Sequence, residues 1–136
     1  MDAKDGVCVV AVFLKVGKKE NPEIAKIIAG LKHCTFKGKR HTMDNKVDIL
    51  KLIPTSSDYY FYYGSLARPP CIECTVWIVY QDPIEISHGQ LDAFNELQNH
   101  RPHHEGVKIC NNYRPLCPVG SRKILFVKVP KKGCAC

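Results

Sequence analysis

This sequence of 136 residues contains no apolar run of the ~18–20 residues that a membrane-spanning helix requires, so no membrane span is expected. Its first residues, Met1–Gly6, have no apolar stretch after a basic start, so no signal peptide is predicted. As written, the chain is expected in the cytoplasm, and it would be secreted if residues are missing before Met1. No internal repeat or low-complexity tract is present either.

Basic residues outnumber acidic ones by 20 to 13, which gives a formal net charge of +7. Such a charge can attract nucleic acid or acidic membranes. The lysines and arginines are scattered, however, and the densest cluster, Lys37–Arg40, is short and has no repeated aromatic platform. We therefore expect a solvated basic face and no nucleic-acid partner. A basic scaffold that binds acidic polymers is an alternative, and steep salt dependence would identify it.

The length fits one domain, and an apolar content of 45% is enough to build a core. Runs of β-branched and aromatic residues predict strands. The first run, Val7–Leu14, is apolar at every position, which favours a strand that is buried on both faces and is not an edge. The other expected strands are Tyr59–Tyr63, Cys71–Tyr80, Pro83–Ile86 and Ile124–Val129.

Two helix starts are visible between these strands. Asn21 is the expected N-cap of the first helix, and Pro22 is its first residue. Ser87 and Gln90 form a capping-box pattern that begins the second. Val47–Ile53 can hold one short helical turn. Strands with two peripheral helices make the fold class mixed and predominantly β.

Three local patterns raise the question of metal, redox or lipid chemistry. Four potential ligands lie in one polar loop: His100, His103, His104 and Glu105. Their spacing fits no standard zinc motif, so a solvated loop is expected. The C-x-x-C pair that begins at Cys71 resembles half of a zinc or redox motif, but the chain has no second pair. The C-terminal C-x-C is like that of doubly prenylated tails, although it is not a C-a-a-X box.

Five motifs, in order, resemble those of one family, the alpha-carbonic anhydrases. Asp5–Gly17 is similar to the family's DG-x-AV-x-G-x-F-x-K-x-G strand, and Tyr62–Pro70 is similar to its Y-x-GSLTTPP loop. The motifs E-x-VTW, PI-x-x-S-x-x-Q and N-x-RP are matched by Glu73–Trp77, Pro83–Gln90 and Asn112–Pro115. The resemblance covers nearly all of residues 5–129, and together these motifs are highly specific.

The resemblance implies a large, mostly antiparallel sheet whose active site lies in a cone that opens to its centre. This chain matches only the C-terminal half of that fold. Residues 1–129 are therefore interpreted as a partial domain, and residues 130–136 as a basic tail that contains Cys134 and Cys136. Complete family members bind zinc through three histidines, two of them in an H-x-H-W strand. The third histidine of the family lies on a neighbouring strand. Neither the H-x-H-W motif nor a match to this third histidine occurs here, so we expect no metal ligands and no cofactor in this chain.

The resemblance also indicates a defect at the catalytic loop. In active members, the first Thr after Gly-Ser-Leu accepts a hydrogen bond from the zinc-bound hydroxide and thereby orients it toward carbon dioxide. Here that gatekeeper position is Ala67, which has no hydroxyl group. Arg68 follows, where the family commonly has a second Thr, and it would put a charge at the mouth of the cavity.

Other pocket positions persist. The apolar wall that holds carbon dioxide in active members is matched by Val7, Val9, Leu66 and Trp77. Without the metal, core packing is the expected role of these four. Asn112 matches a residue that supports one zinc-binding histidine, and a role in a turn is expected for it here.

These features favour a carbonic anhydrase-like chain without hydratase activity of its own, either a truncated product or a binding module. Its partner would be an unknown protein or the missing N-terminal half. Unpaired strand edges also favour self-association. The alternative is a fragment of a zinc carbonic anhydrase that catalyses the reversible hydration of carbon dioxide to bicarbonate, and upstream sequence with H-x-H-W would identify it.

Overall fold

The computed structural model describes residues 6–54, 58–109 and 112–130, which form two compact units. The first unit contains the chain up to Phe13, the segment Ile53–Pro83 and the chain from Tyr113 onward. The second unit contains Leu14–Leu52 and Ile84–Asn112. The C-terminal C-x-C motif lies outside the described residues. The expected division into a partial domain and a tail stays a prediction.

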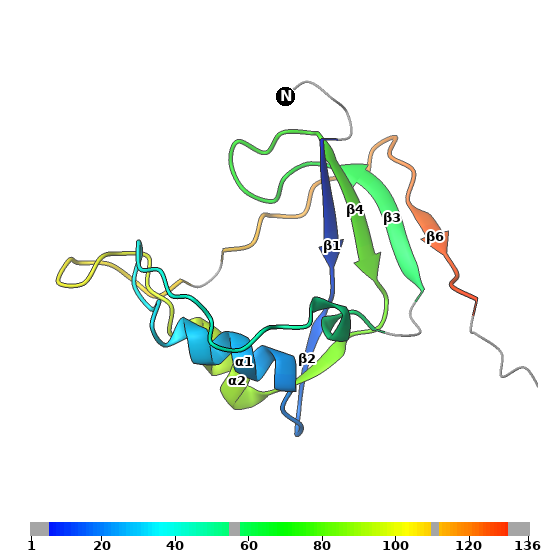
Figure 1. Cartoon of the computed structure of the whole chain (residues 1–136). Coiled ribbons are helices and arrows are strands. Elements are labelled where there is room, and N and C mark those ends of the chain that lie inside the picture. The colour runs from blue at the N-terminus through cyan, green and yellow to red at the C-terminus, as the bar shows by residue number, and fades with distance from the viewer. Residues whose placement is uncertain (1–5, 55–57, 110–111, 131–136) are drawn as a thin grey trace, which may run out of the picture. The chain divides into compact units, whose positions relative to one another are not determined.

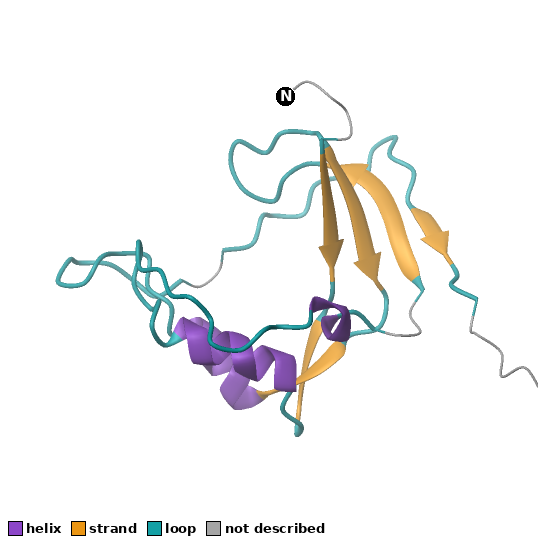
Figure 2. Ribbon diagram, in the orientation of Figure 1, coloured by secondary structure: helices purple, strands orange, loops and turns teal. Residues whose placement is uncertain are grey.

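The first unit is built on one mixed sheet. Its strands are β1 (Val7–Ala11), β3 (Tyr59–Gly64), β4 (Thr75–Tyr80) and β6 (Leu125–Val127). Their order is β1-β4-β3-β6 (Figure 1). β1 runs parallel to β4, whereas the β3–β4 and β3–β6 pairs are antiparallel. The described residues of the first unit form strands and no helix (Figure 2), and the helices belong to the second unit. The chain therefore agrees with the predicted mixed, predominantly β class.

The register of the sheet decides which side chains share a face. Val9 pairs with Trp77, and Trp77 pairs with Tyr62 on its other side. The rings of Tyr62 and Trp77 are stacked, with centroids 6.3 Å apart and planes 6° from parallel. Residues that face each other across neighbouring strands point to the same side of a sheet. Three predicted strands thus contribute to one apolar face.

The sequence prediction for Val7–Leu14 is wrong in two respects. β1 ends at Ala11, and Leu14 begins β2 (Leu14–Gly17) in the second unit. Within the described residues β1 pairs only with β4, so it is an edge strand. Cys8 and Val10 are exposed, Val10 to 50%. The run is apolar on both faces, yet the described part of the chain provides a neighbouring strand on only one side of β1.

The other four predicted strands are confirmed with changed bounds: β3 is one residue longer than predicted, β5 (Ile84–Ser87) is shifted by one residue, and the other two are shorter. β4 begins at Thr75, four residues after the predicted start at Cys71. Cys71 has a φ of 56°, in the left-handed region that a strand cannot use. The last strand is confined to Leu125–Val127.

The second unit holds two parallel strands, β2 and β5 (Ile84–Ser87), with α1 (Pro22–Leu31) and α2 (His88–Asn95). A short 3₁₀ helix, Ile49–Leu52, occupies the predicted helical turn. Ile86 is fully buried and Ile24 is 5% exposed, so they form the core of this unit. Neither helix has the length and apolar character needed to cross a membrane.

Gln90 joins the starts of the two helices. The side chain of Asn21 caps α1 by accepting hydrogen bonds from the backbone N–H groups of Glu23 and Ile24. The predicted capping box of Ser87 and Gln90 begins α2. Gln90 Oε1 also accepts from the Asn21 N–H at 2.9 Å, and its Nε2 donates to the Asn21 carbonyl at 2.8 Å. Gln90 is 3% exposed, so this pair of hydrogen bonds is shielded from water.

Glu23 is a buried carboxylate that ties α1 to a later loop. Its oxygens accept hydrogen bonds from the backbone N–H of Asp48 and from Lys26 Nζ, each at 2.9 Å. Lys51 Nζ lies 3.8 Å away. The Asp48 hydrogen bond is the largest cause that lowers the pKa of Glu23, followed by the hydrogen bond from Lys26.

We expect Glu23→Gln to lower the stability of the second unit at neutral pH. A carboxyl whose pKa is lowered on folding stabilises the protein above its unfolded pKa, and this contribution disappears as the pH falls through the folded pKa. The difference between wild type and variant should therefore shrink from about pH 7 to about pH 3. Thermal unfolding followed by circular dichroism measures it, with Glu20→Gln as an exposed control. Equal pH profiles for wild type and Glu23→Gln would refute this role.

Candidate functional site

The loop that joins β3 to β4 is held by both backbone and side chains. Trp77 Nε1 donates to the Ser65 carbonyl at 3.0 Å, and the Leu66 N–H donates to the Ile72 carbonyl at 3.0 Å. The Arg114 guanidinium donates to Ser65 Oγ and to the Leu66 carbonyl. These bonds fix the residues that immediately precede Ala67.

Gly64 precedes this loop and leaves room for the Trp77 ring. A Cβ atom at Gly64 would lie 3.1 Å from Cδ1 of Trp77 and 3.2 Å from the Tyr62 ring. Such distances are tighter than normal carbon contacts, so a side chain here would displace one of the rings. The glycine thus allows the tryptophan to reach the loop carbonyl.

A cavity of about 400 Å³ lies in the first unit beside this loop. Strands β3 and β4 contribute Tyr62 and Trp77 to its lining, and the loop between them contributes Ala67. The segment after Tyr113 supplies the rest of the lining, including Leu116 and two arginines, Arg114 and Arg122. The lining is therefore largely apolar, with two guanidinium groups.

The structure brings several of the predicted pocket residues together. Ala67 and Trp77 line the same cavity, and Val9 is the register partner of Trp77. Val7 lies two residues earlier on β1, on the same side of the sheet, and Leu66 is in the anchored loop. The expected role of Val7, Val9, Leu66 and Trp77 in core packing stays a prediction.

Two other predicted positions are not part of this group. Arg68 is exposed, and its carbonyl accepts a hydrogen bond from the Cys71 N–H at 2.9 Å. Arg68 is not among the residues that line the cavity. Asn112 is an exposed loop residue assigned to the second unit. Its expected role in a turn stays untested.

Sequence reasoning missed Thr75, which lies at the start of β4. It is 1% exposed, and its Oγ1 has no hydrogen-bond partner among the described residues. It pairs with Val7 on one side and Gly64 on the other, and it shares a face with Trp77. The signal was present: the chain reads Thr75-Val76 where the matched motif E-x-VTW has Val before Thr. The polar residue of the pair is therefore at the buried position.

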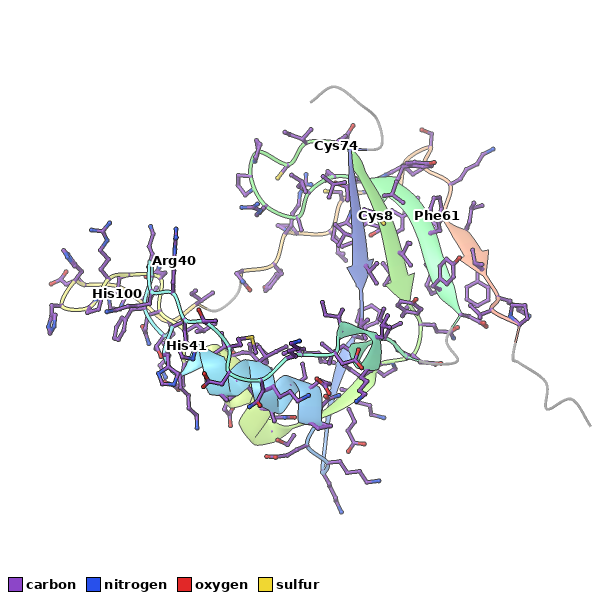
Figure 3. All side chains as sticks on the ribbon, viewed as in Figure 1. Cys8, Arg40, His41, Phe61, Cys74 and His100 are labelled. Atoms are coloured by element: carbon purple, nitrogen blue, oxygen red, sulfur yellow. The ribbon has the colours of Figure 1, made fainter. Side chains whose placement is uncertain are left out.

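The histidine loop does not form a metal site in the part of the chain that the structure describes. No group of three or more His, Cys, Asp or Glu residues that could hold a metal ion occurs there. The ring nitrogens of His100 lie 2.9 Å from the Arg101 carbonyl and 3.3 Å from Gln98 Oε1. The ring of His100, which Figure 3 labels, also packs edge-on against Phe36. These contacts hold the His100 ring within its loop.

The described cysteines are free thiols. Cys74 lies immediately before β4 (Figure 3) and is 6% exposed, whereas Cys71 is half-buried in the same loop. No disulfide joins this C-x-x-C pair.

Comparison with known proteins decides the family. The model of the eukaryotic-type carbonic anhydrases matches residues 1–128 of this chain. The chain belongs to the carbonic anhydrase family. This confirms the resemblance that the five sequence motifs indicated.

The relatives are proteins of about twice this length. Carbonic anhydrase 1 of Monodelphis domestica is 38% identical over 120 residues, which cover 88% of this chain and 45% of that protein. Carbonic anhydrase 1 of Oryctolagus cuniculus is 39% identical over 120 residues, with 88% and 50% covered. Carbonic anhydrase 3 of Homo sapiens is 33% identical over 121 residues, with 89% and 46% covered. The chain thus spans about half the length of the curated relatives it matches.

Carbonic anhydrases in general depend on zinc, and the residues described here do not fit that ion. Among these residues, no three histidine, cysteine, aspartate or glutamate side chains lie close enough together to hold one metal ion. A structural or catalytic zinc needs at least three protein ligands around one point. Any zinc that acted with this chain would need ligands from outside the described residues.

We expect Thr75→Val to stabilise the first unit. The change removes a buried hydroxyl that has no described partner and keeps the β-branched shape, so the free energy of unfolding should rise by about 1 kcal/mol. Urea denaturation monitored by the fluorescence of Trp77 measures this change. The exposed Thr42→Val serves as the control and should be neutral within about 0.5 kcal/mol. A loss of stability in Thr75→Val would reveal a hydrogen bond at this hydroxyl.

Proposed function

We propose that this chain is a carbonic anhydrase-like polypeptide without hydratase activity of its own, and that it acts as a binding module for a second polypeptide. Ala67 carries the first part of this proposal. It occupies the position at which active relatives use a threonine hydroxyl. A methyl group can neither donate nor accept a hydrogen bond, so Ala67 cannot orient a nucleophile. This argument depends on a residue within the chain and not on where the chain begins.

The open edge of β1 supports the second part of the proposal. An unpaired edge presents a row of free N–H and C=O groups, and proteins usually protect it with charges or proline. β1 and the two residues after it, Val7–Phe13, contain neither. The opposite edge strand β6 is only three residues long and is followed at once by Lys128. β1 is therefore the edge that favours strand addition from a partner.

The proposed partner is a polypeptide equivalent to the remaining half of the carbonic anhydrase domain. The support is the length of the relatives, since this chain covers 45–50% of those compared above. When that half is absent, a second copy of the chain is the competing occupant of the β1 edge.

The alternative function is that of a zinc carbonic anhydrase, with this chain as one part of the enzyme. The half-length coverage favours this possibility as well. The two functions differ in the consequence of Ala67. In a complete enzyme, Ala67 would limit the rate, whereas in a binding module it would have no effect.

We expect the purified chain, supplied with equimolar zinc, to hydrate carbon dioxide no faster than buffer in a stopped-flow assay. Ala67→Thr should leave this result unchanged, because a hydroxyl alone supplies no metal ligand. A zinc-dependent rate clearly above buffer would contradict the proposal.

The wild-type chain and the Ala67→Thr variant also test the alternative function. Each is reconstituted with the N-terminal half of human carbonic anhydrase 3, and the activities of the two complexes are compared. If the chain is part of an enzyme, the Ala67→Thr complex should be about 10–100-fold faster than the wild-type complex. If neither complex is active although both form, the function as a binding module is supported.

We expect the isolated chain to self-associate through β1 and Val10→Lys to reduce this association. A lysine on an edge strand opposes the approach of a second strand, because its charge would have to be desolvated. Sedimentation velocity measures the species present. Ile49→Lys, which changes another exposed apolar residue in the second unit, is the control. A wild-type chain that sediments as a single monomeric species would contradict the open edge as an association site.

A further inference from the structure

Two arginines of the segment after Tyr113 are fixed at the cavity beside Ala67. Arg114 uses its Nη1 to reach Ser65 Oγ and the Leu66 carbonyl. Arg122 donates from Nε to the Val119 carbonyl at 3.1 Å and from Nη2 to the Pro118 carbonyl. Both guanidinium groups line the cavity. The Ser65 hydroxyl and the backbone carbonyls named above hold the two guanidinium groups in these positions.

These acceptors leave much of each guanidinium group unused. A guanidinium carries five N–H donors. Among the described residues, the bonds of Arg114 engage only Nη1 and leave its Nε and Nη2 for another acceptor, and the bonds of Arg122 leave its Nη1. No ion pair within the described ranges involves an arginine. No carboxylate is among the residues that line this cavity, although Glu73 lines a second cavity that Arg122 also lines. The first cavity therefore offers hydrogen-bond donors and positive charge.

The rest of the lining is apolar. Trp77 and Tyr62 contribute stacked aromatic rings, and Leu116 and Ile124 contribute aliphatic side chains. Leu116 is fully exposed and Ile124 is 49% exposed, so both have apolar surface that a ligand could cover. A volume of about 400 Å³ lies within the range of small-molecule sites, which are mostly apolar with a few convergent polar groups.

We propose that this cavity binds a small organic monocarboxylate. The carboxylate lies between Arg114 and Arg122, because a guanidinium can donate two parallel hydrogen bonds to its two oxygens. The apolar body of the ligand lies against Trp77 and Leu116. A neutral apolar ligand would leave the guanidinium groups unpaired, and a small inorganic anion would leave the apolar lining uncovered.

This site goes beyond the proposed function. It needs no metal ion and no partner at the β1 edge. Arg122 lies in none of the sequence motifs that carry the family resemblance. The site can therefore be present in a chain with no hydratase activity, and it can be absent from a chain that associates through β1.

The experiment uses the fluorescence of Trp77, the single tryptophan of the chain, in the full-length protein. Hexanoate is titrated at low salt, and hexanamide, which has the same apolar body without the charge, is titrated in parallel. We expect a saturable change with hexanoate and about tenfold weaker binding of hexanamide. Equal binding of the two ligands, or no saturable change with hexanoate, would overturn the proposal.

Variants separate the site from general charge effects. Arg122→Gln should weaken hexanoate binding about tenfold, whereas Arg101→Gln, which removes the same charge from a loop of the second unit, should leave it unchanged. Circular dichroism shows whether each variant is folded, and Lys123→Gln repeats the loss of charge in the first unit beside Arg122. Equal losses in all three variants would overturn the proposal. A response to an acidic apolar peptide with none to hexanoate would assign the cavity to a protein partner, and would overturn it too.

Discussion

A strand in the interior of a sheet must have its backbone groups paired on both sides, and this requirement governs the first unit. β4 meets it through β1 and β3, and β3 meets it through β4 and β6. β1 carries a sequence suited to such an interior position, yet it has one neighbour among the described residues. The open edge and the exposure of Val10 follow from this mismatch, and the proposal of a partner rests on it.

Local signals allowed both helices to be predicted from the sequence. Asn21 with Pro22, and Ser87 with Gln90, act within one helical turn, so their geometry depends little on the rest of the chain. The position of β1 depends instead on which strands are available to flank it, and a single run of apolar residues does not contain that information. The burial of Glu23 was unpredictable for a similar reason, because its backbone partner Asp48 lies 25 residues away.

The candidate site could be predicted in part. The loop motif located Ala67, and the strand motif located Trp77, because both motifs carry fixed spacings. The two arginines at the cavity were not predicted, since their positions depend on how the segment after Tyr113 returns to the sheet. Thr75 was detectable as an inverted Thr-Val pair, but its significance depends on burial, which only the register of the strands reveals.

The hydrogen bonds between Gln90 and Asn21 also constrain the order of folding during synthesis. They join residues 69 positions apart, and the β1–β4 ladder has a similar separation, with Val7 paired to Thr75. Closing such long loops is entropically costly, and chains dominated by distant contacts fold slowly. On the ribosome, β1 cannot pair with β4 until the chain has emerged as far as Tyr80, and Asn21 cannot bond to Gln90 until that residue has emerged. The apolar side chains of β1 therefore stay without their β4 partners until that point, when chaperones have access to them.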